Sequence, residues 1–127
     1  MDKTETFEDL KCWQAAYGLK RRLWNEVIKA MPKQERFELY SQILRAARSA
    51  TSNIAEGWGR FHFLDSRRFY YNSRGSLSEI LDHLIEARDL EYISEESYQS
   101  LRLDTIRAIK ILNGYIRYLK KEAEGSE

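Results

Sequence analysis

Cysteine and proline each occur once in this 127-residue chain, and glycine occurs only six times. A single thiol cannot form an intramolecular disulfide, so Cys12 excludes a disulfide framework and fits a reducing compartment. No apolar run approaches the roughly 20 residues that span a membrane. The N-terminal segment MDKTETFEDL is acidic, unlike a signal peptide. We therefore expect a cytoplasmic protein with one domain over residues 1–127, ordered from about 7 to 121 and ending in a flexible acidic tail.

Residues that could carry out catalysis are also few. The chain has two histidines, His62 and His83, and neither lies near Cys12 in the sequence. It contains no G-x-S-x-G motif, phosphate-binding loop or dinucleotide fingerprint. We therefore interpret Cys12 as an inert small residue, and we predict a protein that is not an enzyme and needs no cofactor.

One segment has the spacing of a metal site. Glu79, Asp82, His83 and Glu86 follow one another at steps of three and four residues, which places them on one face of a helix. Di-metal bundles use such faces, but they need matching carboxylates from other helices. Only Glu56, near a helix end, is available for that role. We therefore interpret the segment as a solvated acidic face and predict no metal site.

Most of the chain carries a helical pattern. Apolar residues recur at three- and four-residue steps in segments of about 10–31, 35–56, 65–90 and 94–119. The first ends before Pro32, because the residue before proline is pushed out of the helical region. The last begins at Ser94, a favourable N-cap. Since no window alternates with period two, we predict an all-α fold, an up-down-up-down antiparallel four-helix bundle.

The stretch TSNIAEGWGR (51–60) places a tryptophan between two glycines. We expect the second helix to close at Glu56, with Gly57 in the left-handed conformation that terminates helices. Trp58 would then fold back over the end of the bundle, and Gly59 would let the chain reverse. On this interpretation Gly57, Trp58 and Gly59 form a structural turn.

The same stretch belongs to a set of motifs with a recognisable order. The motifs are FEDLKCWQAA (7–16), SQILRAARSATSNIAEGWGR (41–60), SRGSLSEI (73–80) and DLEYISEESY (89–98). Together they resemble the four helix bundle protein family, which includes proteins encoded in intervening sequences of bacterial large-subunit ribosomal RNA genes. Ser66 and Asn72-Ser73 depart from the apolar residues usual in that family, which puts the local packing of the third helix in question.

The resemblance implies an assembly and a kind of partner. Members of the family that it resembles assemble into a barrel-like homopentamer, so the resemblance implies a homo-oligomer here, a pentamer. The chain is more distantly similar to the accessory variability determinant of diversity-generating retroelements. That protein is a pentameric bundle with a basic surface, and its partners are a reverse transcriptase and nucleic acid. A reverse transcriptase or ribosomal RNA is therefore the partner that the resemblance suggests.

Charge is distributed unevenly along the chain although the net charge is only +1. Residues 41–77 carry a local charge of +4, residues 78–104 carry −6, and residues 105–121 carry +5. Basic stripes at helical spacing are suited to nucleic-acid phosphates, because guanidinium groups bind oxygen pairs and displace condensed counterions. The predicted nucleic-acid-binding residues are Arg45, Arg48, Arg60, Arg67, Arg68, Arg107, Lys110, Arg117 and Lys121. Phe61, His62 and Phe63 would add rings on which bases could stack.

The last helical segment carries a second apolar row beside its core row. Ile111, Tyr115 and Tyr118 form this row and are the predicted oligomer interface. Small residues at 46–50, and Gly75 in the third segment, would allow close approach of helices. Tight packing within one chain is the alternative explanation for both features.

These patterns leave two functions open. The first is a non-enzymatic, homo-oligomeric scaffold that binds RNA or single-stranded DNA through its basic helix faces. The second is a protein–protein interaction module without nucleic-acid binding, whose basic stripes pair with acidic partners or with the acidic segment 78–104 of another subunit.

Overall fold

The computed structural model describes residues 4–35, 37–60 and 62–125, and within them the chain is helical without a β-strand. The long helices are α1 Lys11–Arg22, α2 Leu39–Trp58, α3 Phe63–Asp89 and α4 Glu95–Gly125. Helix α1 continues into a π-helical segment, Leu23–Val27, and a 3₁₀ turn, Ile28–Ala30. Further 3₁₀ turns, Phe7–Asp9 and Lys33–Glu35, precede α1 and α2. The predicted all-α fold is confirmed, and the helices fit a four-helix bundle.

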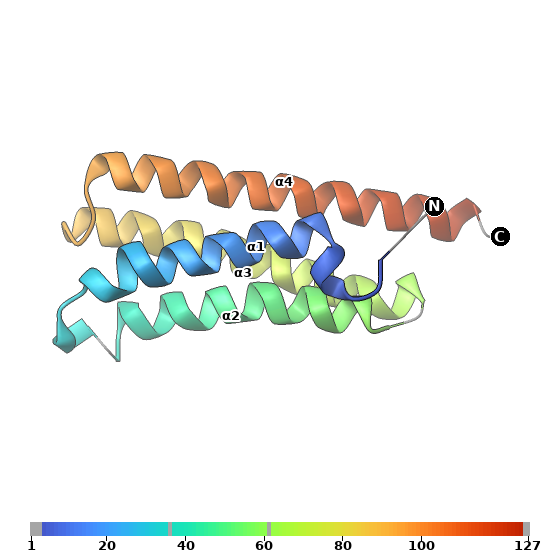
Figure 1. Cartoon of the computed structure of the whole chain (residues 1–127), viewed down its shortest axis with the longest axis horizontal. Coiled ribbons are helices and arrows are strands. Elements are labelled where there is room, and N and C mark those ends of the chain that lie inside the picture. Colours follow the sequence, from blue (N-terminus) through green and yellow to red (C-terminus); the bar gives the residue numbers. More distant parts are fainter. Residues whose placement is uncertain (1–3, 36, 61, 126–127) are drawn as a thin grey trace.

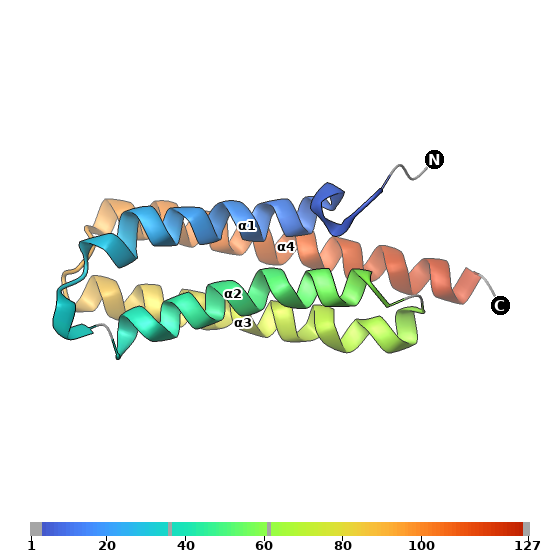
Figure 2. The same ribbon diagram turned by 60° about the horizontal axis from the view of Figure 1, so that its bottom comes forward.

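The helices lie side by side along the long axis of the molecule, and their connections lie at the two ends (Figure 1, Figure 2). Helices α1 and α3 each pack against both α2 and α4. The end of α2, the start of α3 and the end of α4 share one end of the bundle (Figure 1). Segments that are separate in the sequence but similar in charge are thereby brought to the same end.

Helix α1 buries a different face from the one its aromatic residues suggest. Its buried residues are Cys12, Ala16, Leu19 and, in the following π-helical segment, Leu23 and Val27. The large rings lie at the edge or outside: Trp13 stacks on Tyr17 with centroids 4.8 Å apart, and Trp24 is 40% exposed. Short side chains at the contact let α1 approach its neighbours closely, which two indole rings would prevent.

Helix α4 begins as predicted and ends later than predicted. The backbone N–H of Ser97 donates to Ser94 Oγ at 3.0 Å, so Ser94 is the N-cap. The helix continues beyond Lys121 to Gly125, so the acidic segment 122–125 is helical, not the irregular tail that we expected. Lysine residues 120 and 121 stand one turn before Glu124, where such pairs support a helix.

The prediction that Gly57 ends the second helix in a left-handed conformation was wrong. Helix α2 runs through Gly57 to Trp58, and no described glycine has a positive φ. A Cβ at Gly57 would lie 2.8 Å from the ring of Tyr70, which is 1% exposed. Gly57 therefore gives space to a buried ring of α3, and helix termination does not require it.

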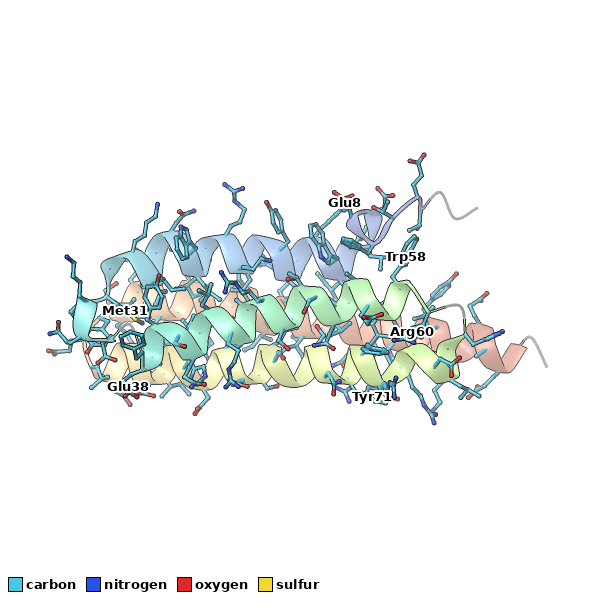
Figure 3. All side chains as sticks on the ribbon, turned by 90° about the horizontal axis from the view of Figure 1, so that it is seen from below. Glu8, Met31, Glu38, Trp58, Arg60 and Tyr71 are labelled. Carbon is cyan, nitrogen blue, oxygen red and sulfur yellow. The ribbon has the colours of Figure 1, made fainter. Side chains whose placement is uncertain are left out.

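Trp58 and Gly59 also differ from the expected turn. Trp58 is 36% exposed and projects from the end of α2 (Figure 3), so it does not plug the bundle end. Gly59 caps the helix with right-handed dihedrals, φ −70° and ψ −11°. The left-handed residue of the described chain is Glu91, with φ 62°, in the turn after α3. There the N–H groups of Glu91 and Tyr92 donate to Arg88 and Ala87.

Serine hydroxyls of α3, including the family-pattern departures Ser66 and Ser73, find acceptors on α2 or within α3. Ser73 Oγ donates to the carbonyl of Ala50 at 2.6 Å, and Ser76 Oγ donates to Ser49 Oγ at 2.8 Å. Ser66 Oγ donates to the carbonyl of Phe63 at 3.2 Å. The small residues of α2 therefore serve packing within the chain. Gly75 does not, because a Cβ there would meet nothing within 4 Å.

Candidate nucleic-acid interface

The nine predicted cations come from three helices and are all exposed. Arg45 and Arg48 lie on α2 and Arg60 just after it; the others are on α3 (Arg67, Arg68) and α4 (Arg107, Lys110, Arg117, Lys121). Their partners divide them into groups with different uses. A cation already bound to a carboxylate must give up that contact before it can bind a phosphate.

Three of the nine make ion pairs within the chain. Arg45 lies 3.5 Å from Glu79 Oε2 of α3, and Arg60 lies 3.4 Å from Glu56. Arg107 lies 3.1 Å from Asp104. These exposed pairs contribute little to stability but lower the local positive charge. Arg45, Arg60 and Arg107 are therefore the weaker members of the predicted interface.

The arginines around Phe69 form a second group. The guanidinium of Arg60 lies 4.9 Å from the Phe69 ring centroid, and that of Arg68 lies 4.8 Å away. Both contacts are cation–π interactions that hold the arginines in place. Of the rings predicted to stack on bases, Phe63 is partly buried at the start of α3, His62 is exposed, and Phe61 lies outside the described residues.

The remaining cations make no ion pair with a described residue. Arg67 lies on α3, Lys110, Arg117 and Lys121 lie on α4, and Arg48 lies on α2. A hydrogen bond of 2.9 Å from Arg74 of α3 to Asn113 Oδ1 of α4 sets the register of these two helices. The start of α3 and the end of α4 share one end of the bundle (Figure 1), so Arg67, Arg117 and Lys121 lie toward that end.

Tyr71 and Arg74 lie on the same part of α3 as Arg67, and neither was among the predicted site residues. Tyr71 is 41% exposed, and the Arg74 guanidinium lies 5.0 Å from its ring centroid. Arg67, Tyr71 and Arg74 follow one another at steps of four and three residues, a spacing that places them on one helical face. That spacing is a sequence signal that could have identified them. We call the surface of residues 63–77 and 105–121 the basic half of the α3/α4 pair.

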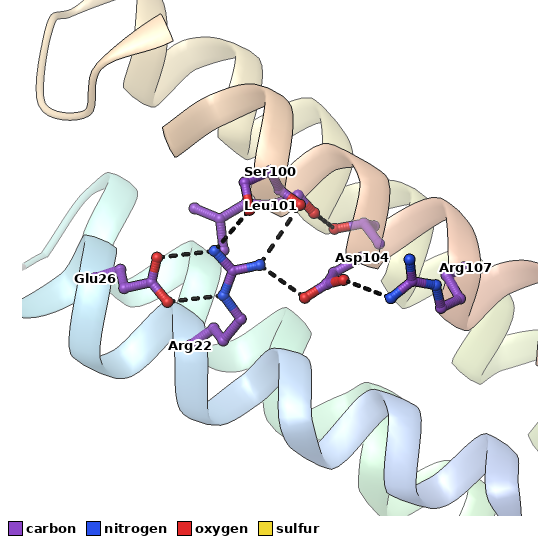
Figure 4. A network of polar contacts seen from close by, with 7 residues as sticks. Arg22, Glu26, Ser100, Leu101, Asp104 and Arg107 are labelled. Atoms are coloured by element: carbon purple, nitrogen blue, oxygen red, sulfur yellow. Dashed lines mark hydrogen bonds and ion pairs between the residues drawn. The ribbon is translucent and has the colours of Figure 1, made fainter. Parts of the chain in front are cut away.

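In the acidic half of the α3/α4 pair, residues 78–104, Arg102 is exposed without an ion pair to a described residue, whereas Arg88 is paired. Arg88 lies 3.2 Å from Asp89, 3.9 Å from Glu95, and 4.3 Å from the Tyr98 ring centroid. At the border with α1, Arg22 contacts Glu26 and Asp104, both at 2.7 Å, and also Ser100 (Figure 4). The Arg22 guanidinium lowers the pKa of Glu26. Arg22 and Arg88 fasten helices together and leave little charge for a ligand.

Candidate catalytic and metal-binding residues lie outside the basic half of the α3/α4 pair. Burial raises the pKa of the Cys12 thiol to about 12, so the thiol is protonated at neutral pH. Among the described residues no group of three or more metal-binding side chains comes together. Of the predicted acidic face, Glu79 Oε2 accepts a hydrogen bond from His83 Nε2 at 3.1 Å, and it also contacts Arg45. No described helix is long and apolar enough to cross a membrane.

The predicted oligomer row is partly used within the chain. Ile111 and Tyr115 pack partly buried against the core, and Tyr115 meets Tyr70 edge to face at 5.4 Å. Tyr118 stacks on Tyr115 at 6.4 Å and remains 54% exposed. Beside this row, between α1 and α4, lies an open groove of about 390 Å³ with Gly18 in its lining. Tyr118 is thus the residue of the row with the most surface to offer another subunit.

Comparison with known proteins identifies the family. The model of the 23S rRNA-intervening sequence protein family matches residues 8–114. The chain belongs to this family. The resemblance inferred from the sequence motifs is therefore confirmed for the 23S rRNA-intervening sequence proteins. No curated protein matches the chain.

A solved structure supports the fold. It is the crystal structure of a protein with unknown function from the S23 ribosomal protein family of Bacteroides thetaiotaomicron, and its TM-score to this chain is 0.75. The two are 24% identical, and the match covers 83% of this chain and 97% of the other. At that identity the likeness supports the helical fold of this 23S rRNA-intervening sequence family member and carries no function.

Proposed function

We propose that this protein is a non-enzymatic, homo-oligomeric scaffold that binds RNA or single-stranded DNA. The observation that carries the proposal is the basic half of the α3/α4 pair. There Arg67, Lys110, Arg117 and Lys121 are exposed and make no ion pair with a described residue. The ligand's phosphates would supply the negative charge that the chain does not.

The energetics favour a phosphate backbone as ligand. Each cation that neutralises a phosphate releases condensed counterions, a gain that does not depend on base sequence. Because the net charge of the whole chain is only +1, attraction must come from this local surface and must fall off beyond roughly one Debye length of 8–10 Å. A scaffold of this kind is expected to bind many sequences with similar affinity.

The bundle and its assembly are part of the proposal. In it, the helices follow the up-down-up-down order, and copies associate through the side of α4 that carries Tyr118. A pentamer, the state suggested by the family resemblance, would present the basic half of the α3/α4 pair five times. Several weak sites on one particle would then combine into useful avidity.

Binding titrations test the ligand. Fluorescence anisotropy of labelled single-stranded RNA and DNA, measured between low and physiological salt, should show log affinity falling linearly with log salt. The slope should be about 0.7 per phosphate contact for single strands. If the intact oligomer binds neither probe at low salt, the nucleic-acid proposal is wrong. The protein–protein interaction module, in which the basic half pairs with acidic protein surfaces, then becomes the better explanation.

Sedimentation tests the assembly. The wild-type protein should sediment as a multimer of about five chains at micromolar concentration. Tyr118→Glu should release monomers of unchanged helicity, because it places a charge on a 54% exposed interface side chain. Tyr115 is a poor choice for this test, since its ring also contacts Tyr70 within the chain. A wild-type monomer would contradict the assembly.

A further inference from the structure

Tyr71 has an environment that no other exposed ring of the described chain shares. It is 41% exposed on α3, and the Arg74 guanidinium lies over the ring at 5.0 Å. Arg74 is itself anchored by donating to Asn113 Oδ1 of α4 at 2.9 Å. The ring is therefore braced by a cation that is tied to the neighbouring helix, which reduces the entropy lost when a ligand binds.

The cations around Tyr71 are arranged on both helices. Arg67 lies one turn before it on α3, and Arg117 of α4 lies one turn after Asn113, the partner of Arg74. Neither Arg67 nor Arg117 makes an ion pair with a described residue. A strand that binds across α3 and α4 there would therefore meet a phosphate-binding cation from each helix.

We propose that Tyr71 is the stacking platform for one unpaired base of a single-stranded ligand, with Arg67 and Arg117 holding the flanking phosphates. This inference rests on the proposed function. It specifies that the ligand is single-stranded and that Tyr71 is the ring on which a base stacks. Stacking on a tyrosine needs the face of a base, which a duplex keeps inside its own stack. Single strands are thereby selected over duplexes, and base identity matters little because every base has a π face.

Other rings near cations are less suitable. Phe69 is approached by the guanidinium groups of both Arg60 and Arg68, at 4.9 and 4.8 Å. Tyr118 is stacked on Tyr115 and lies on the proposed subunit interface. Trp13 and Tyr17 stack on each other on α1. Tyr71 is exposed, and the guanidinium over its ring belongs to an arginine that is tied to α4.

Substitutions of Tyr71 test the inference with matched controls. Tyr71→Ala should weaken binding of a labelled single-stranded 12-nucleotide probe by roughly 5- to 150-fold, the loss of one base–aromatic stack. The salt slope should stay unchanged, because no phosphate contact is removed. Tyr71→Trp keeps a π face and should bind within about threefold of wild type. Circular dichroism and thermal melting establish that each variant is folded; this exposed side chain is not part of the core.

Two further probes separate stacking from charge. A duplex of the same length should bind wild type and Tyr71→Ala equally, and so should a single strand in which every base is replaced by an abasic sugar. If Tyr71→Ala binds the normal single strand as tightly as wild type does, the platform is wrong while the phosphate scaffold stands. The same holds if the duplex shows the same loss. If wild type binds no probe, both the platform and the proposed function are wrong.

Discussion

The two halves of the α3/α4 surface have the same backbone architecture and opposite electrostatics. In the acidic half, Arg88 is surrounded by Asp89, Glu95 and the Tyr98 ring, and Arg22 of α1 joins Glu26 to Asp104. In the basic half, Lys110, Arg117 and Lys121 make no ion pair with a described residue. An arginine count alone therefore does not define a binding surface. What matters is whether the fold supplies each cation with a carboxylate.

The core beneath the basic half gives the largest expected effect. Gly57→Ala should lower the free energy of unfolding by about 1–3 kcal/mol, because its Cβ would lie 2.8 Å from the Tyr70 ring and overpack the core. Gly59→Ala is the matched control: its Cβ would meet only backbone oxygens at 3.5 and 3.7 Å, and the φ of −70° suits alanine. Urea unfolding of both variants measures the difference. Equal stabilities would contradict the role of Gly57 as space for the ring.

The acidic half should lose stability when its network is broken. Arg22→Gln should cost about 1 kcal/mol, because Glu26 and Asp104 lose their partner. Arg117→Gln, an exposed cation of the basic half, should change stability by less than about 0.5 kcal/mol. Thermal or urea unfolding compares the two. If Arg117→Gln is the more damaging, the division into structural and available cations is wrong.

The same network predicts a pH dependence. Because Arg22 lowers the pKa of Glu26 below its ordinary value of 4.5, the pair contributes stability above that value. The contribution is lost as the pH falls through the lower pKa of the folded state. Unfolding measured from pH 6 to pH 3 should therefore decline less steeply in Arg22→Gln than in wild type. Parallel curves would show that Glu26 titrates without help from Arg22.

The turn that joins α3 to α4 gives the smallest expected effect. Glu91 holds a left-handed conformation, φ 62°, that glycine adopts at lower cost. Glu91→Gly should raise the free energy of unfolding by about 0.5 kcal/mol, the net of relieved strain and greater freedom of the unfolded chain. A raised urea midpoint with an unchanged slope is the expected result. A lowered midpoint would mean that the Glu91 side chain matters more than its backbone.

The existence of the helices could be predicted from the sequence, and their finer relations could not. Apolar spacing located each helix, and Ser94 marked the start of α4. On α1 the short residues Cys12 and Ala16 are buried while the large rings lie at the edge, a preference for close helix approach that apolar spacing alone does not reveal. Gly57 was correctly singled out for the wrong reason: a sequence does not say whether glycine serves φ or a neighbouring ring.

The candidate site was predictable only in outline. Charge runs along the chain located its helices, but the partners of individual cations are long-range contacts. Arg45 is paired with Glu79, 34 residues away, and Arg74 with Asn113, 39 residues away. Such pairs depend on which faces of two helices meet and on their register, which helical periodicity within one segment does not contain.

A matched pair of triple variants tests the central claim most directly. Lys110, Arg117 and Lys121 are replaced by glutamine in one, and Arg45, Arg60 and Arg107 in the other, so both lose three positive charges. Anisotropy titrations with one single-stranded probe at several salt concentrations compare them with wild type. The first variant should lose at least about tenfold in affinity and about 2 units of salt slope, while the second should stay within about threefold of wild type. Equal losses in both variants, or no loss in the first, would contradict the claim that the unpaired cations of α4 form the nucleic-acid interface.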